Sequence, residues 1–302
     1  MTKLEWCRTN APDAIKNLPD DQLLELMEQA FNSIGINEID QAEFESVEYN
    51  LNNINNHLDY MVLELVRVFG NTLAFKGGYL LTKLIPDKAR QTTDIDFSIN
   101  NSDVYEKLKD ELITISLYFI NLGVIDDYKV KEEVLERKSG GVDFYKDGRK
   151  ILGVDVGLHR TNYGTRHWNL DIGTLSGFEV ERMLADKISA ILYRKRFRRP
   201  KDLYDLYCIS ESFDFKVDKV RKYILLRTDG LGADWDNYPF SEEVQREYKK
   251  AYDKLILDSI YQGIKLGRPS FEIVIERFNI IADCIKFESN LTTWKFECKH
   301  FV

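Results

Sequence analysis

Cysteine and histidine are scarce in this chain of 302 residues, which contains four of each. The cysteines lie far apart without Cys-x-x-Cys spacing, so reduced thiols are expected instead of a disulfide framework or a zinc site. The histidines are equally scattered, and no Cys–His or Ser–His pairing indicates a nucleophilic enzyme. We expect structural or surface roles for them, including His159 and His167, which flank a loop after a predicted strand.

Long apolar segments are also missing. No window approaches the run of about 18 apolar residues that a membrane-spanning helix requires, so no membrane association is expected. The segment Met1–Asn10 lacks the apolar core of a signal peptide, and a cytoplasmic location is the default expectation. The sequence has no internal repeats and no low-complexity segment. Its 44% hydrophobic and 30% charged residues are typical of a globular protein that can bury a large core.

The chain has no excess of basic residues as a whole, although one short segment is strongly basic. The net charge of −8 argues against general coating of nucleic acid. The segment Lys187–Lys201, however, carries seven basic residues and no acidic one. Such a basic island in an acidic protein suggests one specific anionic partner. The island consists of Lys187, Arg194, Lys195, Arg196, Arg198, Arg199 and Lys201.

Apolar periodicity predicts an α+β protein, with a mixed sheet and flanking helices followed by a mostly helical C-terminal domain. Helices are predicted over residues 21–31, 47–69, 79–84, 103–121, 178–194, 202–212, 215–226, 241–266 and 270–287. Strands are predicted over residues 72–75, 94–99, 128–136, 141–145 and 150–158. The change of pattern near residues 173–177 predicts two domains, 1–174 and 175–302.

A glycine turn followed by a pair of aspartates is the most informative pattern. Gly77 and Gly78 follow a short buried strand and precede a predicted helix, whose first amide groups favour phosphate. After fifteen further residues, Asp94 and Asp96 stand on a predicted strand. Because strand residues i and i+2 share a face, both carboxylates lie together with Ser98, opposite an apolar face. Magnesium prefers carboxylates, water and phosphate oxygens, so this pattern predicts a Mg²⁺ and phosphate site.

A third carboxylate, Asp155, lies on the predicted strand 150–158. Alternation places it opposite an apolar face and between Gly153 and Gly157, which leaves room for a ligand beside it. Three carboxylates on adjacent strands fit a two-metal site for phosphoryl transfer. Asp155 would complete that site or act as the base that deprotonates the attacking hydroxyl. The alternative is an aspartate that faces solvent on a half-exposed strand.

Two predicted helices carry further charged residues. Lys187 lies at the edge of an apolar stripe, from which its ammonium either reaches a phosphate as a point charge or extends to solvent. Asp202 and Asp205 share one face of the next helix at i and i+3 spacing. They could orient Lys187 or Arg194, or pair with the basic island. They could also stabilise the first turn of their own helix, and this last role applies most directly to Asp202.

These segments together resemble the AbiEii-type nucleotidyltransferase toxins of bacterial type IV toxin–antitoxin and abortive-infection systems, within the superfamily that shares the DNA polymerase β-like nucleotidyltransferase fold. Three motifs carry the resemblance, in a specific order that extends from Phe75 to Tyr207. They are Lys76-Gly77-Gly78 followed by Arg90–Asp96, then Leu184–Lys187, then Arg199–Leu206. In the last motif Lys201 stands where the family commonly has arginine, which keeps the charge but loses bidentate geometry.

The resemblance implies a mixed sheet that carries the metal-binding carboxylates and a helical C-terminal half. It also implies transfer of a nucleoside monophosphate from a nucleoside triphosphate, GTP or CTP, with release of pyrophosphate. The expected acceptor is the 3′ end of tRNA, and the expected effect is blocked translation in phage defence. An antitoxin encoded beside the toxin is implied as well, without a stable complex.

Each candidate residue then has an expected role. The expected ligands of a two-metal Mg²⁺ site are Asp94, Asp96 and Asp155. Lys187, supported by Asp202 and Asp205, would neutralise charge on the triphosphate. The remaining nucleotide-binding candidates are Lys76, Gly77, Gly78, Arg90, Thr92 and Thr93. The RNA backbone would bind, with salt-dependent affinity, to Arg194, Lys195, Arg196, Arg198 and Arg199.

Other functions stay open at this stage. An adenylyltransferase that modifies a protein or a small molecule would not need the basic island. A non-catalytic nucleotide-binding or RNA-binding regulator could use the same fold, but it would not need three carboxylates beside a triphosphate. A purely structural protein would leave the order of the motifs to chance.

Overall fold

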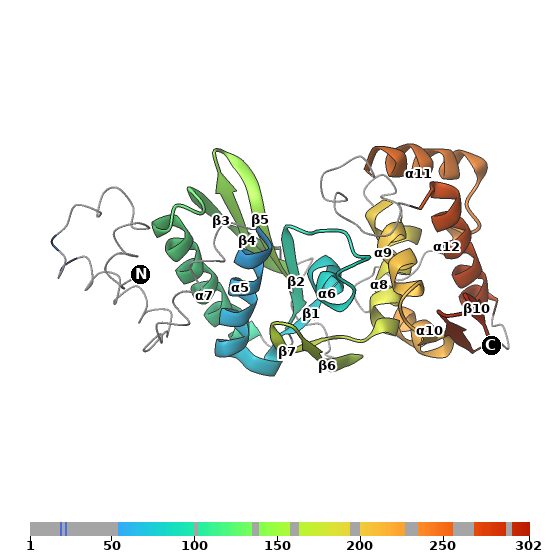
Figure 1. Ribbon diagram of the computed structural model, residues 1–302, viewed down its shortest axis with the longest axis horizontal. Coiled ribbons are helices and arrows are strands. Elements are labelled where there is room, and N and C mark those ends of the chain that lie inside the picture. Colours follow the sequence, from blue (N-terminus) through green and yellow to red (C-terminus); the bar gives the residue numbers. More distant parts are fainter. Residues whose placement is uncertain are drawn as a thin grey trace. The chain divides into compact units, whose positions relative to one another are not determined.

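The computed structural model of the chain describes residues 19, 22, 54–99, 102–134, 139–157, 163–193, 200–226, 235–255, 269–287 and 292–302. These residues form two compact units (Figure 1). The first contains the described residues up to Leu73 and those between Thr93 and Thr161. The second contains Ala74–Thr92 and the described residues after Asn162.

In the first unit, the strands follow the order β3-β4-β5-β2. Strand β2 is parallel to β5, and the other neighbours are antiparallel. The strands are β2 (Asp94–Ser98), β3 (Asp127–Val134), β4 (Ser139–Lys146) and β5 (Arg149–Gly157). The helical elements are α5 (Ile54–Phe69), the short 3₁₀ helix η1 (Gly70–Thr72) and α7 (Ser102–Asn121).

One face of this sheet is apolar and covered by helices. Ile95 and Phe97 of β2, Phe144 of β4 and Val154 of β5 are all buried. The ring of Phe119 in α7 lies 6.2 Å from the ring of Phe144, which places this helix against the apolar face. Because strand side chains alternate, the aspartates between these residues lie on the opposite face.

In the second unit, β1 (Ala74–Lys76), β7 (Gly173–Phe178) and β6 (Thr165–Leu170) follow the order β1-β7-β6. Strand β1 is parallel to β7, with Phe75 opposite Gly177, and β6 is antiparallel to β7. The short helix α6 (Gly77–Leu84) follows β1 directly. A smaller antiparallel sheet consists of β8 (Phe215–Lys216), β9 (Thr293–Lys295) and β10 (His300–Phe301).

The rest of the second unit is helical and shares one apolar core. Its elements are α8 (Val180–Leu192), α9 (Pro200–Ser210), α10 (Val217–Leu225), the 3₁₀ helix η3 (Trp235–Asn237), α11 (Glu242–Leu255) and α12 (Phe271–Lys286). Aromatic contacts join these elements: the rings of Phe240 and Phe278 stack at 5.5 Å. The buried Trp294 ties β9 to α9, because its Nε1 donates to the carbonyl of Ser210 at 2.8 Å.

The predicted α+β class is confirmed, and most predicted elements of the described residues are present within a few residues of their expected bounds. The predicted strand 72–75 is shifted, since residues 70–72 form η1 and β1 begins at Ala74. The predicted helix 215–226 begins as strand β8. The predicted helix 21–31, apart from residue 22, and residues 256–266 of the predicted helix 241–266 lie outside the described residues.

Strands β6, β7, β9 and β10 were not expected from the sequence. Strand β7 occupies the region of the predicted domain boundary; the boundary between residues 174 and 175 stays a prediction, although both residues lie within this strand. The reason for β7 is non-local: Gly177 allows the backbone of β1 to approach, because a Cβ there would lie 3.2 Å from the carbonyl oxygen of Phe75. Of the helices described, none has the length and apolar character to cross a membrane.

Candidate active site

Three predicted metal ligands lie on one face of the sheet in the first unit. Asp94 and Asp96 of β2 share a face because they are two residues apart. The parallel register places Asp96 beside Asp155 of β5 and Asp94 beside Gly153. Since laterally paired strand residues point to the same side, Asp155 joins the two aspartates of β2. The register thus brings together carboxylates that lie far apart in the sequence.

Two lysines, which sequence reasoning missed, each join one of these carboxylates to a further one, Asp143. Lys131 of β3 lies 2.6 Å from Asp155 Oδ1 and 2.9 Å from Asp143 Oδ1. Lys150 of β5 lies 3.0 Å from Asp94 Oδ1 and 2.8 Å from Asp143 Oδ1. Asp143 of β4, also missed, therefore forms ion pairs with both ammonium groups. The only feature of the sequence that could have indicated this role of Asp143 was its position on a predicted strand, two residues after Gly141.

The charges of this network reinforce one another. Burial alone would lower the pKa of Lys150, but the hydrogen bonds to Asp143 and Asp94 outweigh it and raise that pKa. The pKa of Lys131 is raised in the same way by Asp155 and Asp143. Burial acts to raise the pKa of Asp143, and its bonds with the two lysines lower it overall. All three side chains therefore carry charge at neutral pH.

Gly153 leaves the space in which Asp94 and Lys150 meet. A Cβ at Gly153 would lie 2.5 Å from Asp94 Oδ1 and 2.7 Å from Lys150 Nζ. The sequence predicted room for a ligand beside Asp155. At Gly153, this room is filled by the side chains of Asp94 and Lys150. Both atoms are the ends of flexible side chains, so an alanine there would move them without breaking the strand.

Gly153→Ala should therefore impair the site more than the fold. We expect about a tenfold loss of nucleotide transfer, because displaced catalytic groups lose their working geometry. The free energy of unfolding should change by less than about 1 kcal/mol, since alanine suits a strand interior better than glycine. Parallel transfer assays and urea denaturation check both. A variant that unfolds readily, or that keeps full activity, would contradict this interpretation.

The donor chemistry of this face fits Mg²⁺, because Asp94, Asp96 and Asp155 supply carboxylate oxygens on one side of the sheet. Within the described ranges, no group of three or more His, Cys, Asp or Glu residues is placed to bind a metal ion. The side chains of Asp94 and Asp155 are nevertheless 34% and 50% exposed, so a ligand can reach them. Carboxylate oxygens are the ligands that Mg²⁺ prefers. The contacts from Lys131 and Lys150 distinguish this arrangement from a metal-binding one.

The glycine turn belongs to the second unit and adjoins other nucleotide-binding candidates. Gly77 has a φ of +68°, which side chains rarely adopt, and α6 begins at this residue. A Cβ at Gly78 would lie 3.1 Å from both Arg90 Nη2 and Thr92 Oγ1. Four candidates, Gly77, Gly78, Arg90 and Thr92, thus surround the first turn of a helix, where amide groups and the helix dipole favour phosphate.

Lys76 and Thr93 flank these residues in the chain. The ammonium of Lys76 lies 5.7 Å from the ring centroid of Phe178, at the end of β1. Thr93 uses its carbonyl to accept from the amide of Gly153 at 2.9 Å and leads into β2. The predicted contact of either residue with phosphate stays a prediction.

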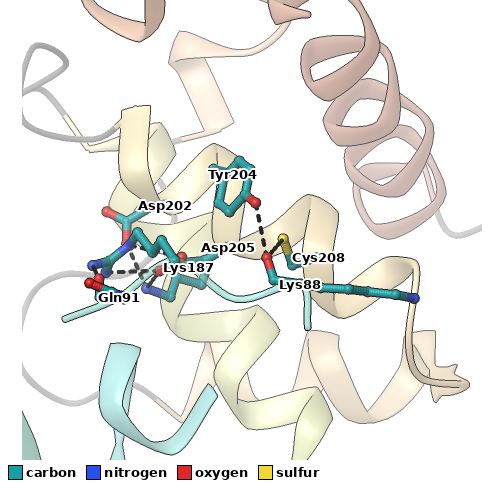
Figure 2. Close-up of polar contacts among 8 residues, drawn as sticks. Lys88, Gln91, Lys187, Asp202, Tyr204, Asp205 and Cys208 are labelled. Carbon is teal, nitrogen blue, oxygen red and sulfur yellow. Dashed lines mark hydrogen bonds and ion pairs between the residues drawn. The ribbon is translucent and has the colours of Figure 1, made fainter. Parts of the chain in front are cut away.

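A buried charge network lies beside the turn in the second unit. Arg90 donates from Nε and Nη2 to the two carboxylate oxygens of Asp205, at 3.0 and 3.2 Å. Lys187 of α8 donates to Asp205 Oδ2 at 2.6 Å and to Asp202 Oδ1 at 2.9 Å, as Figure 2 shows for these three residues. The Lys187 side chain is only 11% exposed, so it does not extend to solvent. Of the alternatives for Asp202 and Asp205, the geometry supports orientation of Lys187.

The same network fixes the segment between α6 and β2. Tyr204 of α9 donates its hydroxyl to the carbonyl of Lys88 at 2.9 Å, and Cys208 Sγ lies 3.4 Å from that oxygen (Figure 2). Together with the pair between Arg90 and Asp205, these contacts tie the segment to α9. Arg90, Lys187 and Asp205, one from each predicted motif, therefore belong to one network in this unit.

Ionisation of the network is strongly favoured. Burial acts to raise the pKa of Asp205, but Arg90 and Lys187 lower it to about 2. Burial acts to lower the pKa of Lys187, and Asp202 and Asp205 raise it overall. Asp205 and Lys187 are thus both charged over the whole neutral range and compensate one another.

Comparison with known protein families shows which family the chain belongs to. The family described as nucleotidyl transferase AbiEii toxin, type IV TA system, matches residues 64–277, more than half of the chain. The chain belongs to this family. The match includes both carboxylate groups and the glycine turn, and it confirms the resemblance that the motifs indicated.

Solved structures resemble this AbiEii-family chain more distantly. The nucleotidyltransferase toxin MenT4 from Mycobacterium tuberculosis H37Rv is 18% identical, with a TM-score of 0.46 over 77% of this chain and 84% of that one. The Megavirus polyadenylate synthase is 15% identical, with a TM-score of 0.36 over 74% of this chain and 43% of that one. No curated protein matches the sequence.

The predicted RNA-binding residues of this AbiEii-family toxin lie outside the described residues. They are Arg194, Lys195, Arg196, Arg198 and Arg199. Lys201, the last member of the basic island, is exposed on the first turn of α9. The proposed contact of the island with RNA stays a prediction from the sequence.

Proposed function

We propose that this AbiEii-family chain is a Mg²⁺-dependent nucleotidyltransferase that transfers a nucleoside monophosphate from GTP or CTP to the 3′ end of tRNA. Membership of the family supports transferase activity on a nucleoside triphosphate and an antitoxin partner. Blocked translation, growth arrest and phage defence follow from a modified tRNA end. The observation that carries the proposal is the register of β2 and β5, which groups Asp94, Asp96 and Asp155 on one accessible face.

The proposed reaction is an in-line displacement at the α-phosphorus. The acceptor hydroxyl oxygen forms a bond to this phosphorus, and the bond to the bridging oxygen breaks, so pyrophosphate leaves with the electron pair. Asp94 and Asp96 would hold Mg²⁺, which when bound neutralises the triphosphate and makes the acceptor hydroxyl more acidic. Asp155 either completes this ligand set or accepts the hydroxyl proton.

Phosphate recognition is assigned in this proposal to the glycine turn at the start of α6. The first amides of α6, together with the Thr92 hydroxyl, would bind phosphate oxygens. Lys187 contacts Asp202 and Asp205, and because an ammonium has three donors it could keep both aspartates and still donate to a phosphate oxygen. Lys187 would then neutralise charge on the triphosphate, while Asp205 holds it together with Arg90 beside the glycine turn.

Labelling identifies the nucleotide and the acceptor. The purified protein is incubated with total tRNA, Mg²⁺ and each α-labelled triphosphate, and label from GTP or CTP is expected at the tRNA 3′ end. A variant in which Arg194, Lys195, Arg196, Arg198 and Arg199 are replaced by glutamine should lose most of this labelling, because backbone contacts supply affinity. Label in protein or in a small molecule, unchanged by that variant, would contradict the tRNA assignment. Triphosphate binding without transfer would indicate a regulator.

A further inference from the structure

Asp143 occupies a shared position in the carboxylate network of the first unit. One of its oxygens, Oδ1, lies 2.9 Å from Lys131 Nζ and 2.8 Å from Lys150 Nζ. The second partner of each lysine is a candidate metal ligand, Asp155 for Lys131 and Asp94 for Lys150. Each ammonium is thus shared between Asp143 and one carboxylate of the proposed metal site.

A metal ion and an ammonium would compete for the same two carboxylates, those of Asp155 and Asp94. The lysines contact Asp155 Oδ1 and Asp94 Oδ1, and Mg²⁺ would need carboxylate oxygens of the same residues. Like charges at short range repel, so metal binding requires both ammonium groups to move away. A buried or half-buried ammonium without a partner is costly, and it therefore needs another carboxylate close by.

Asp143 meets that need without a large movement. It lies on β4 opposite Gly153 of β5, and Gly153 in turn lies opposite Asp94 of β2. Asp143 and Asp94 therefore flank the same glycine. Its side chain is 21% exposed and already contacts both lysines. The neighbouring Lys129, opposite Asp143 on β3, has its ammonium 5.0 Å from the ring of Tyr145. Asp143 is thus the carboxylate placed to keep both bridging lysines neutralised when a metal arrives.

We propose that Asp143 is a positioning residue that draws Lys131 and Lys150 away from Asp155 and Asp94 and so makes the site competent for metal. Each lysine is shared between Asp143 and one candidate ligand, and in this proposal Asp143 retains both lysines when metal binds. This inference rests on the proposed function, because it takes Asp94, Asp96 and Asp155 as the metal ligands. It adds residues that act through those ligands and never touch the substrate.

Binding of Mn²⁺, measured by electron paramagnetic resonance of the free ion, tests this role without an activity assay. Asp143→Asn should weaken Mn²⁺ binding about 10-fold to 100-fold, the range for residues that orient metal ligands. Lys150→Met should strengthen binding several-fold, because a competing cation is gone. Lys146→Met is the matched control: this lysine ends β4 and pairs with the exposed Asp126 at 2.8 Å, away from these carboxylates. Its affinity should be that of wild type.

A double-mutant comparison separates positioning from direct ligation. In a background of Lys131→Met and Lys150→Met, Asp143→Asn should change the Mn²⁺ affinity little, because the lysines through which it acts are absent. An undiminished effect in that background would overturn the proposal and make Asp143 a ligand. Unchanged binding by Asp143→Asn in the wild-type background would also overturn it. If Asp96→Asn binds Mn²⁺ as wild type does, the metal site itself and the proposed function fail as well.

Discussion

Asp96→Asn should lower nucleotide transfer by about a thousandfold or more, since loss of metal-assisted charge stabilisation costs several kcal/mol in the transition state. The substitution keeps the shape of the side chain and removes one charge from a face where Asp96 lies beside Asp155. We expect the free energy of unfolding to change little, because asparagine keeps the size of the side chain and its capacity for hydrogen bonds. The unfolding temperature should therefore stay within about 3 °C of wild type. Label transfer and thermal unfolding of the same preparation check both parts.

Asp126→Asn provides the matched control. Asp126 belongs to the same unit and also pairs with a lysine, Lys146, at 2.8 Å, but it lies outside the carboxylate face. Its transfer activity should equal that of wild type. If Asp126→Asn and Asp96→Asn lose activity equally, the loss reflects general charge and not a metal site. Full activity of Asp96→Asn would exclude the proposed catalytic role of β2.

Asp205→Ala should produce the largest loss of stability, about 3–5 kcal/mol, because removing one partner of a buried ion pair leaves uncompensated charge. Arg90 would lose both of its hydrogen bonds to Asp205, and Lys187 would keep only Asp202 among these two aspartates. The free energy of unfolding from urea denaturation measures the loss. Transfer activity should fall with it, since Arg90 lies beside the glycine turn that is proposed to bind phosphate.

An exposed ion pair in the same unit gives the comparison. Asp214 contacts Lys295 at 2.6 Å and is 41% exposed. Asp214→Ala should cost less than about 1 kcal/mol, the usual value for surface pairs. Equal losses for the two substitutions would show that burial of the network around Asp205 contributes nothing to the free energy of unfolding.

The pH dependence of stability follows from the direction of the pKa shifts. The pKa of Asp205 is lowered from 3.8 to about 2, so its contribution is present above about pH 4 and is lost as the pH falls toward 2. The pKa of Lys187 is raised above 10.5, so its contribution is complete below that value and is lost as the pH rises through the raised pKa. The difference between wild type and Asp205→Ala should thus be largest near neutral pH and shrink in acid.

Local pattern was sufficient for the parts of the site that depend on one segment. Alternation placed Asp94 and Asp96 on one face, and the positive φ of Gly77 agrees with the predicted turn. The partner of Asp96 could not be read locally, because it depends on which residue of β5 pairs with β2. The register with Asp155 supplies that information.

Ion pairing explains most of what sequence reasoning missed. The sequence named Asp202 and Asp205 as possible partners of Lys187, and the structure pairs it with both; contact of Lys187 with phosphate stays a prediction. Asp143 and Lys150 come from neighbouring strands, and only the antiparallel pairing of β4 and β5 brings them within 2.8 Å. The strands β6 and β7 likewise depend on distant partners, which periodicity does not show.

The most direct test of the central claim is a crystal structure with Mn²⁺ and a non-hydrolysable nucleoside triphosphate. Anomalous scattering locates the metal without assumptions about its ligands. We expect anomalous density bound by Asp94 and Asp96, with Asp155 adjacent, and we expect Lys131 and Lys150 to have moved toward Asp143. Density elsewhere, or none at saturating Mn²⁺ with both lysines still on Asp155 and Asp94, would contradict the assignment of this face as the catalytic metal site.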